Sequence, residues 1–387
     1  MLTRPSSSRR WPSRTPPARI LNAPQPAAQL ALDQPVARLL RAAAARLEAA
    51  GCDEPRLDAE LLLAAACGQS RAWLAAHGGD IPSDSALRPR LEGLPRFAEN
   101  VERRAAREPV AYILGRKEFY GLDLLVDRRV LIPRPETETL VEQALSWIQH
   151  ANVLSMKSMP PQVMGARRYL PPERGMALPS SDRALQRSGE GAGGEAGHAQ
   201  TEPSQQAALT VVDVGTGSGA IALAIAAHTP PAVRLVAADV SPDALTVAKA
   251  NAARLDLADR LTFVQSDLLA GVDAPANLIV ANLPYVSRAE WAALAPDISG
   301  YEPHLALDGG ADGLDLYRRL LAQVQARLPV GANEVPAPAA LLLEIGWQQA
   351  AALRALVRAA FPRARVQIIP DLAGQDRVAL IELRDEP

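Results

Sequence analysis

The sequence predicts an α/β protein whose larger part is a parallel sheet with helices on both faces. Two observations lead to this prediction. From about residue 209 to residue 383, short apolar runs typical of buried strands alternate with helical patterns, as in parallel sheets. From about residue 33 to residue 108, apolar residues recur at helical spacing, which predicts a small helical bundle ahead of the sheet.

The composition is that of an ordinary globular protein. The chain has 387 residues, which suggests two domains or three, and 48% of them are hydrophobic and 22% charged. The formal net charge of −2 gives no sign of a polyanion-binding protein. No apolar run is long enough for a membrane span. Cys52 and Cys67 cannot build a disulfide framework, and no Cys/His cluster has zinc spacing, so we expect no metal.

Two segments depart from this composition. Residues 1–32 contain five arginines and no acidic residue, so we expect a disordered tail. An Arg/Ser-rich start is also typical of an organelle transit peptide. The favoured interpretation is a solvated extension or a misassigned start codon in a cytoplasmic protein. Residues 151–208 hold six prolines and a glycine-rich run without apolar periodicity, which predicts a low-complexity insert.

Helices are predicted throughout residues 33–108, which we expect to form the N-terminal domain. The first helix carries Val36, Leu39, Leu40 and Leu47 at helical spacing and stops at Gly51. Three more are centred on Leu57–Leu62, on Trp73 and Leu74, and on Phe97 and Val101.

A β-hairpin is predicted between the helices and the sheet. From Tyr112 to Val130, apolar residues alternate around Gly121, so we interpret residues 109–135 as a hairpin linker. A helix from Glu136 to about His150 then opens the second domain, which we expect to cover residues 136–387.

The second domain alternates strands with helices. Strand patterns occur at 209–214, 234–238, 261–264, 278–281, 340–345, 366–369 and 378–383, and helical patterns follow the first two, at 220–227 and 242–255. In such folds ligands bind at the carboxyl ends of the strands. The candidate functional residues all lie at these ends.

The first strand runs into the glycine-rich turn Gly215-Thr216-Gly217-Ser218-Gly219. Glycine lacks a Cβ, so the backbone there can approach a ligand closely. Asp239 ends the next strand, where a carboxylate can take two ribose hydroxyls. Together these features predict a nucleotide-like cofactor, although such glycines also serve helix–strand packing. Gly215, Gly217 and Ala220 fit the G-x-G-x-x-A dinucleotide pattern as well, so the loop alone does not choose the cofactor.

Asn282, Leu283, Pro284 and Tyr285 directly follow a later strand and indicate the chemistry. A planar NH₂ group is hard to methylate because its lone pair is delocalised. The side-chain oxygen of Asn282 and the carbonyl of Leu283 could hold such a nitrogen in line with a methyl donor and stabilise the positive charge that develops. Pro284 biases Leu283 towards extended geometry, and Tyr285 offers a face for stacking a flat amide or base.

The glycine turn, preceded by Asp213, resembles the S-adenosylmethionine loop of Rossmann-like class I methyltransferases. This resemblance implies S-adenosylmethionine as cofactor, with Asp213 helping to hold its amino-acid end, Asp267 contacting the adenine amino group and Leu268 lying along the adenine. Asp267 is explained equally well as a helix N-cap or turn residue. The tetrapeptide resembles the (N/D)-P-P-(Y/F/W) motif of methyltransferases acting on adenine, cytosine or glutamine amides, with Leu283 replacing the first proline. Asn282 is then also counted among the cofactor-binding residues.

Further blocks resemble the bacterial peptide-chain release factor glutamine methyltransferases. These blocks are Arg107–Gly115, Glu118–Gly121, Val130–Glu138, Glu302–Pro303, Ala306–Leu307 with Gly310 and Gly313–Leu314, Glu344–Gly346 with Gln349, and Asp371–Val378. The resemblance covers roughly residues 33–150 and 209–385. It implies N(5)-methylation of the glutamine in the Gly-Gly-Gln loop of class 1 peptide-chain release factors, with the helical domain docking the release factor. This mechanism needs no general base, because the proton can leave after methyl transfer.

Three alternatives remain open. A nucleic-acid amino methyltransferase would use the same tetrapeptide, but it needs a basic groove, and the near-neutral charge argues against a nucleic-acid partner. An NAD(P)-dependent oxidoreductase would use Gly215, Gly217 and Asp239 but leaves Asn282–Tyr285 unexplained. A cofactor-binding module without activity is disfavoured because the motif set is intact.

Overall fold

The computed structural model describes residues 34–80, 94–157, 209–327 and 339–383. The chain divides into two compact units, residues 1–114 and residues 115–387, which we describe separately. The expected tail (1–32), and the expected insert (151–208) beyond residue 157, lie outside the described residues and stay predictions.

The first unit is built from short helices around one apolar core. They are α1 (Val36–Ala49), α2 (Pro55–Cys67), α3 (Arg71–Ala76), α4 (Leu94–Ala105) and α5 (Val110–Leu114). The apolar stripe of α1 is buried along its length, from Val36 to Leu47, and packs with residues of α2 and α4. A buried ion pair of 2.7 Å between Arg104 and Asp58 adds a polar link from α4 to α2.

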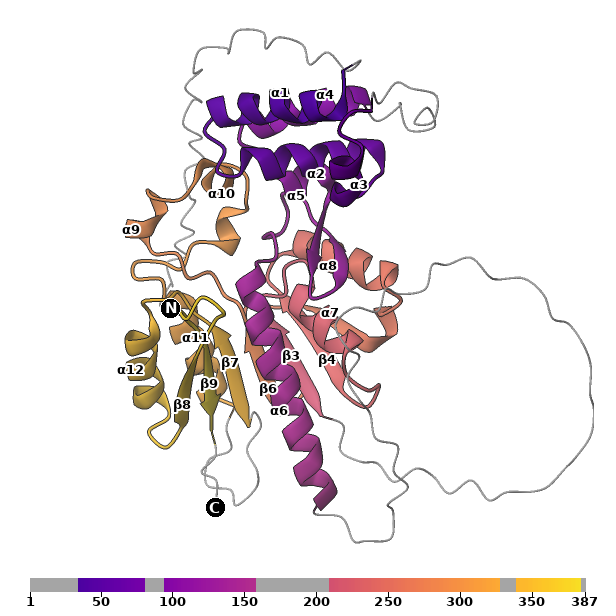
Figure 1. The fold of residues 1–387 in the computed structure, drawn as a ribbon. Coiled ribbons are helices and arrows are strands. Elements are labelled where there is room, and N and C mark those ends of the chain that lie inside the picture. Colours follow the sequence, from indigo (N-terminus) through magenta and orange to yellow (C-terminus); the bar gives the residue numbers. More distant parts are fainter. Residues whose placement is uncertain (1–33, 81–93, 158–208, 328–338, 384–387) are drawn as a thin grey trace, which may run out of the picture. The chain divides into compact units, whose positions relative to one another are not determined.

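The second unit contains a seven-stranded sheet in the order β5-β4-β3-β6-β7-β9-β8 within the described residues (Figure 1). Its strands are β3 (Thr210–Val214), β4 (Arg234–Asp239), β5 (Leu261–Gln265), β6 (Leu278–Ala281), β7 (Ala340–Glu344), β8 (Arg365–Pro370) and β9 (Asp376–Glu382). The strands from β5 to β7 are parallel, as expected. Strand β9 is antiparallel to both β7 and β8, because the short turn at 371–375 joins β8 and β9 as a hairpin and leaves no room for a crossover.

Helices cover both faces of this sheet, which confirms the predicted fold class. They are α6 (Glu138–Lys157), α7 (Ala220–Ala227), α8 (Pro242–Arg254), α11 (Asp315–Gln325) and α12 (Ala350–Ala360). The connections contain the short helices α9 (Arg288–Trp291) and α10 (Pro296–Ser299) and the 3₁₀ turns η2 (Pro135–Thr137), η4 (Ala258–Arg260) and η5 (His304–Ala306). Val211 packs in the core with α6 and α7, whereas its neighbour Val212 packs in the core with α11 and α12. Because both faces are covered, every residue of the central strands β3, β6 and β7 is buried. No helix in the described ranges is long and apolar enough to cross a membrane.

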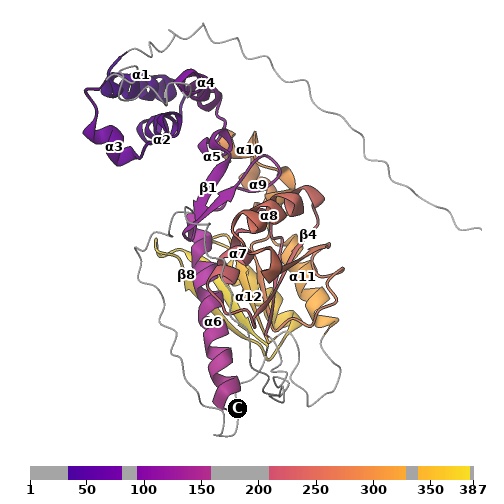
Figure 2. The same cartoon turned by 90° about the vertical axis from the view of Figure 1, so that its right-hand side faces the viewer.

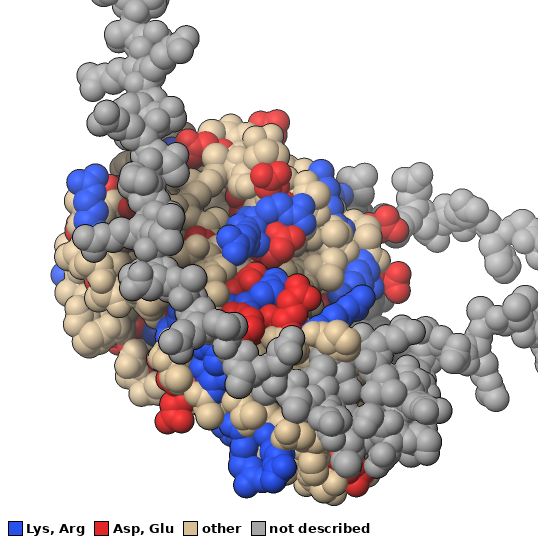
Figure 3. Space-filling view, turned by 90° about the horizontal axis from the view of Figure 1, so that it is seen from above, with Lys and Arg blue, Asp and Glu red and all other residues tan. Residues whose placement is uncertain are grey.

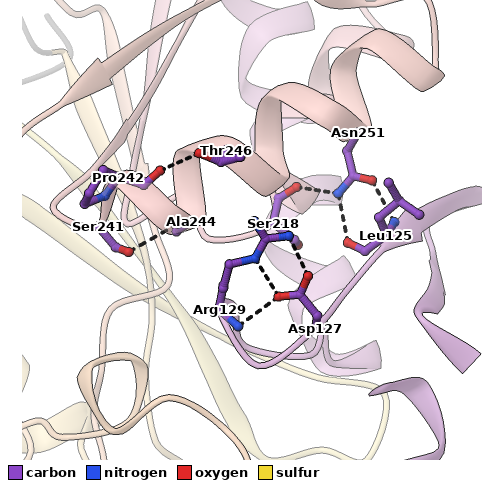
Figure 4. Close-up of polar contacts among 9 residues, drawn as sticks. All are labelled: Leu125, Asp127, Arg129, Ser218, Ser241, Pro242, Ala244, Thr246 and Asn251. Carbon is purple, nitrogen blue, oxygen red and sulfur yellow. Dashed lines mark hydrogen bonds and ion pairs between the residues drawn. The ribbon is translucent and has the colours of Figure 1, made fainter. Parts of the chain in front are cut away.

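The hairpin β1 (Arg116–Phe119) and β2 (Leu122–Leu125) belongs to the second unit and lies beside α8 (Figure 2). Phe119 and Leu124 are buried in the same core as α6 and α7. The buried Asn251 of α8 accepts a hydrogen bond of 2.6 Å from the Leu125 N–H and donates to the carbonyls of Leu125 and Ser218, at 3.0 and 2.9 Å (Figure 4). The end of the hairpin is therefore tied to the glycine turn.

Candidate active site

A cavity of about 310 Å³ lies at the carboxyl ends of the parallel strands in the second unit. Residues that follow β3, β4, β5 and β6 form its walls, and the segments 129–131 and 303–306 contribute Arg129, Val130, Leu131, Pro303, Leu305 and Ala306. This volume is typical of sites for small molecules.

Two glycines of the turn after β3 have different tasks. Gly217 lines the cavity with a left-handed φ of 56°, and a Cβ built on it would meet no atom within 4 Å. Its backbone therefore faces open space that a ligand can fill. A Cβ on Gly219 would lie 3.0 Å from Leu223 and 3.2 Å from Ala248. Gly219 thus serves close packing of α7 and α8, and Gly215, like Gly217, lies in the cavity wall.

Asp239 stands in the cavity wall at the end of β4. Its Oδ2 accepts a hydrogen bond of 2.9 Å from the Gly217 N–H, and its Oδ1 accepts one of 2.9 Å from the Ser241 N–H. Burial raises the pKa of the Asp239 carboxyl, and these two backbone donors oppose that effect. The carboxylate is therefore held rigidly beside the glycine turn.

Asp213 lies behind the glycine turn, outside the residues that line the cavity. Its side chain is fully buried, and its Oδ2 accepts hydrogen bonds from the Thr216 hydroxyl (2.7 Å) and the Ala222 N–H (3.2 Å). Burial raises the pKa of this carboxyl to about 7. Thr216 and Ser218 are buried in the turn as well and do not line the cavity. The structure therefore gives these three residues contacts within the turn.

Asp267 and Leu268 line the cavity beyond the end of β5. The Asp267 carboxylate accepts a hydrogen bond of 2.5 Å from the guanidinium of Arg319, another residue of the cavity wall. Leu268 has a left-handed φ of 55°, which is uncommon for a leucine, and its carbonyl accepts a hydrogen bond of 2.8 Å from the Ser266 hydroxyl.

Asn282, Leu283 and Pro284 line the cavity, and Tyr285 does not. The Asn282 Nδ2 donates a hydrogen bond of 3.2 Å to the Thr137 hydroxyl oxygen. The Leu283 carbonyl accepts one of 3.3 Å from the buried Tyr317 hydroxyl, and a carbonyl retains a second lone pair for a further donor. The structure thus brings the first three residues of the tetrapeptide together with the glycine turn and Asp239.

The backbone of Tyr285 is clamped by residues near in space and far in sequence. Its carbonyl accepts a hydrogen bond of 3.0 Å from Gln349 Nε2. A Cβ on Gly309 would lie 2.8 Å from the Tyr285 backbone, and one on Gly313 would overlap the Tyr285 carbonyl oxygen. Burial, followed by the negative charge of Glu344, raises the pKa of the Tyr285 hydroxyl. Tyr285 therefore acts in this structure as an anchor of the loop.

Sequence reasoning did not assign roles to Thr137 or Arg319. Thr137 lies 145 positions from Asn282, and Arg319 lies 52 positions from Asp267. Thr137 falls in the block Val130–Glu138 that carried part of the resemblance, which was the one available signal. Within the described residues, no group of three or more His, Cys, Asp and Glu side chains could hold a metal ion.

Comparison with known proteins covers most of the chain. Residues 38–115 match the family described as PrmC N-terminal domain, and residues 200–297 match the methyltransferase small domain. Proteins named release factor glutamine methyltransferase align from Cereibacter sphaeroides (38% identity, 89% of this chain and 97% of the relative) and Moorella thermoacetica (37%, 88% and 96%). The relative of that name from Caulobacter vibrioides is 33% identical over 88% of this chain and 93% of its own length. Among solved structures, the human hMettl16 catalytic domain in complex with an RNA hairpin of the MAT2A 3′UTR has a TM-score of 0.43 at 13% identity, over 76% of this chain and 82% of that one.

Proposed function

The chain belongs to the release factor glutamine methyltransferase family, and on that premise we propose that it methylates N(5) of the glutamine in the Gly-Gly-Gln loop of class 1 peptide-chain release factors. One observation supports this proposal most directly. Asn282, Leu283 and Pro284 line the same cavity as the glycine turn and Asp239, so an acceptor amide and a methyl donor can meet there.

The residues of the cavity fit S-adenosylmethionine. Gly217 leaves open space where the backbone would approach the cofactor, and the rigidly held Asp239 suits two ribose hydroxyls. Asp267 and Leu268 suit the adenine, since a carboxylate can accept a further hydrogen bond beside that of Arg319. When bound, this cofactor supplies an electrophilic methyl group.

The cofactor-binding residues that we propose include residues of the cavity wall and residues of the glycine turn that do not line the cavity. The set comprises Asp213, Gly215, Thr216, Gly217, Ser218, Gly219, Asp239, Asp267, Leu268 and Asn282. Within it, Asp213, Thr216, Ser218 and Gly219 contribute by shaping the turn, because they do not line the cavity.

The proposed acceptor site uses two oxygens aimed at one NH₂ group. The Asn282 side-chain oxygen and the Leu283 carbonyl accept its two hydrogens, fix the nitrogen in line with the methyl group and stabilise the charge that develops on it. Pro284 shapes the backbone between these groups. We propose Tyr285 as the face beside which the flat amide lies, and its clamped backbone keeps that face in place. The proton leaves the nitrogen after transfer, so no general base is required.

Charge supports a protein as the acceptor substrate. In the helical unit, the arginines at 46, 71, 103 and 104 pair with Glu102, Glu60, Glu108 and Asp58. On the face shown in Figure 3, basic and acidic side chains lie side by side. A nucleic-acid backbone needs a groove of one sign. We therefore propose that the helical unit docks a release factor, in the cytoplasm where translation terminates.

One assay separates the proposed function from its rivals. The full-length protein is incubated with methyl-labelled S-adenosylmethionine and, in parallel, a class 1 release factor, the same factor with its loop glutamine changed to alanine, stripped RNA, or DNA. Label should appear on the intact release factor alone. Label on nucleic acid, or equal label on the alanine variant, would refute the proposal. Binding of NADH in place of S-adenosylmethionine, followed calorimetrically, would favour the oxidoreductase.

A further inference from the structure

The amide of Asn282 is oriented from behind by Thr137. Its Nδ2 donates to Oγ1 of Thr137, the buried last residue of η2. A side-chain amide is planar, with its oxygen and nitrogen on opposite sides of the terminal carbon. Holding the nitrogen against Thr137 therefore turns the oxygen of Asn282 away from Thr137. The proposed acceptor chemistry needs this orientation, because an NH₂ substrate requires an oxygen and is repelled by an NH₂ group.

A threonine hydroxyl does not enforce this orientation by itself. It has one proton and two lone pairs, so it can accept from the Asn282 nitrogen or donate to the Asn282 oxygen. In the second case the amide is flipped and presents its NH₂ group to the substrate. The orientation of Asn282 therefore depends on where the Thr137 proton is directed.

Glu344 supplies the group that decides this direction. Its side chain, at the end of β7, is fully buried, and its carboxylate oxygens make no hydrogen bond of full geometry among the described residues, although the Thr137 hydroxyl is close enough to act on this carboxyl as a donor. Burial raises the pKa of this carboxyl to about 7, and the Thr137 hydroxyl acts against that effect by favouring the ionised form. An ionised carboxylate only accepts hydrogen bonds. With Glu344 ionised, the Thr137 proton is drawn towards it, and the Thr137 lone pairs are left for Asn282.

Charged and titratable groups surround Glu344 from several elements. The cations of Arg377 on β9 and Arg134 before η2 favour its ionised form, and the carboxyl of Glu136 on η2 disfavours it. Burial chiefly raises the pKa values of the hydroxyls of Tyr285 and of Tyr317 on α11, and the negative charge of Glu344 adds to this effect. In the parallel register of β6 and β7, Ala281 pairs with Leu343, so Asn282 and Glu344 lie at the ends of neighbouring strands.

We infer that Thr137 and Glu344 are positioning residues that hold the Asn282 amide with its oxygen towards the methyl acceptor. The inference rests on the proposed function, since it concerns the same acceptor site. Protonation of Glu344 releases the Thr137 proton from the carboxylate, so correctly oriented Asn282 becomes less populated as the pH falls below about 7.

The test compares Thr137→Val, Thr137→Ser and Glu344→Gln with the wild type. Single-turnover methyl transfer to a release factor should slow roughly 10- to 100-fold in Thr137→Val and Glu344→Gln, as for other losses of orientation. Thr137→Ser should keep most of the rate, because it retains the hydroxyl. The affinity for S-adenosylmethionine, measured by calorimetry, and the KM for the release factor should change by no more than about threefold, because neither side chain lines the cavity.

The pH dependence of the single-turnover rate distinguishes positioning from a merely structural role, because a structural role would leave this dependence unchanged. The wild-type rate should fall between about pH 8 and pH 6, and this part of the fall should be missing from Glu344→Gln and Thr137→Val. The pKa of Asp213 is also about 7, so its titration contributes to the pH profile of every variant. The role of Glu344 is therefore read from the difference between the wild-type profile and the variant profiles. Thr262→Val on the exposed side of β5 and Glu382→Gln on β9 are matched controls.

Two results would overturn the inference. One is a Thr137→Val rate within about twofold of the wild type, and the other is an unchanged pH profile in both variants. Thermal melting checks that each variant folds, and if Glu344→Gln does not fold, the rate and profile of Thr137→Val decide alone. If the wild type itself does not methylate the release factor, the proposed function fails and the inference fails with it.

Discussion

Asp213 makes the pH dependence of stability predictable. Its carboxyl is fully buried, and one of its two oxygens has no partner among the described residues. Burial chiefly raises its pKa to about 7 from 3.8, and the nearby charge of Asp239 adds to this, while hydrogen bonds from Thr216 and Ala222 act against it. Because the folded-state pKa lies above the unfolded one, the folded state binds the proton more tightly. The stabilisation is fully present below pH 3.8 and is lost as the pH rises through about 7.

The size of the effect follows from the two pKa values. A shift from 3.8 to about 7, at about 1.4 kcal/mol per pKa unit, corresponds to roughly 4 kcal/mol between the two limits. About 1.5 kcal/mol of this is already lost at pH 5, so roughly 3 kcal/mol remains to be lost between pH 5 and pH 9. In Asp213→Asn no proton is exchanged at this site. The amide NH₂ that replaces the unpartnered oxygen carries its own cost of about 1–3 kcal/mol, but that cost is the same at every pH.

Urea unfolding of the wild type and of Asp213→Asn, at pH 5 and pH 9, measures this difference. The free energy of unfolding of the variant, relative to that of the wild type, should rise by roughly 3 kcal/mol from the lower pH to the higher. Asp259→Asn, at an exposed position of η4, controls for the general effect of removing a negative charge. An Asp213→Asn difference that is equal at the two pH values would show that the buried carboxyl does not titrate as described.

Three further predictions concern the cavity and the loop beside it. Asn282→Ala should keep the affinity for S-adenosylmethionine within a few-fold and lose most of its turnover, roughly 100-fold or more, in single-turnover assays; full activity would refute its role. Asp239→Ala should weaken cofactor binding at least about 10-fold by calorimetry, since it removes the carboxylate that we propose accepts two ribose hydroxyls, and an unchanged affinity would refute that assignment. Gly313→Ala should slow transfer and lower the melting temperature, because its φ of 79° is left-handed and its Cβ would overlap the Tyr285 carbonyl; a variant indistinguishable from the wild type in both measurements would contradict this.

The features that the sequence predicted best are those that depend only on short, continuous segments of the chain. The strand patterns, the turn Gly215–Gly219 and the tetrapeptide Asn282–Tyr285 each occupy fewer than about ten residues, and local periodicity and turn chemistry suffice to find them. The family is confirmed by relatives that align along most of the chain.

What the sequence did not predict depends on contacts between distant segments. The hydrogen bond from Asn282 to Thr137 joins the end of a strand to a turn 145 positions earlier. The side chain of Asp213 bonds to Thr216 within the turn and does not line the cavity, and an apolar strand pattern does not specify these contacts. The antiparallel direction of β9 follows from the short β8–β9 turn, which an apolar strand pattern cannot distinguish from a crossover.

The hydrogen bonds of Asn251 affect local unfolding of the hairpin and of the glycine turn. One buried amide satisfies backbone groups of both Leu125 and Ser218, and therefore binds the last residue of the hairpin and the glycine turn to the same point on α8. If either segment detaches, polar atoms of the buried Asn251 side chain are left unpaired. Their amide protons should consequently exchange with solvent as one cooperative unit, and a ligand that stiffens the turn would slow exchange in the hairpin as well.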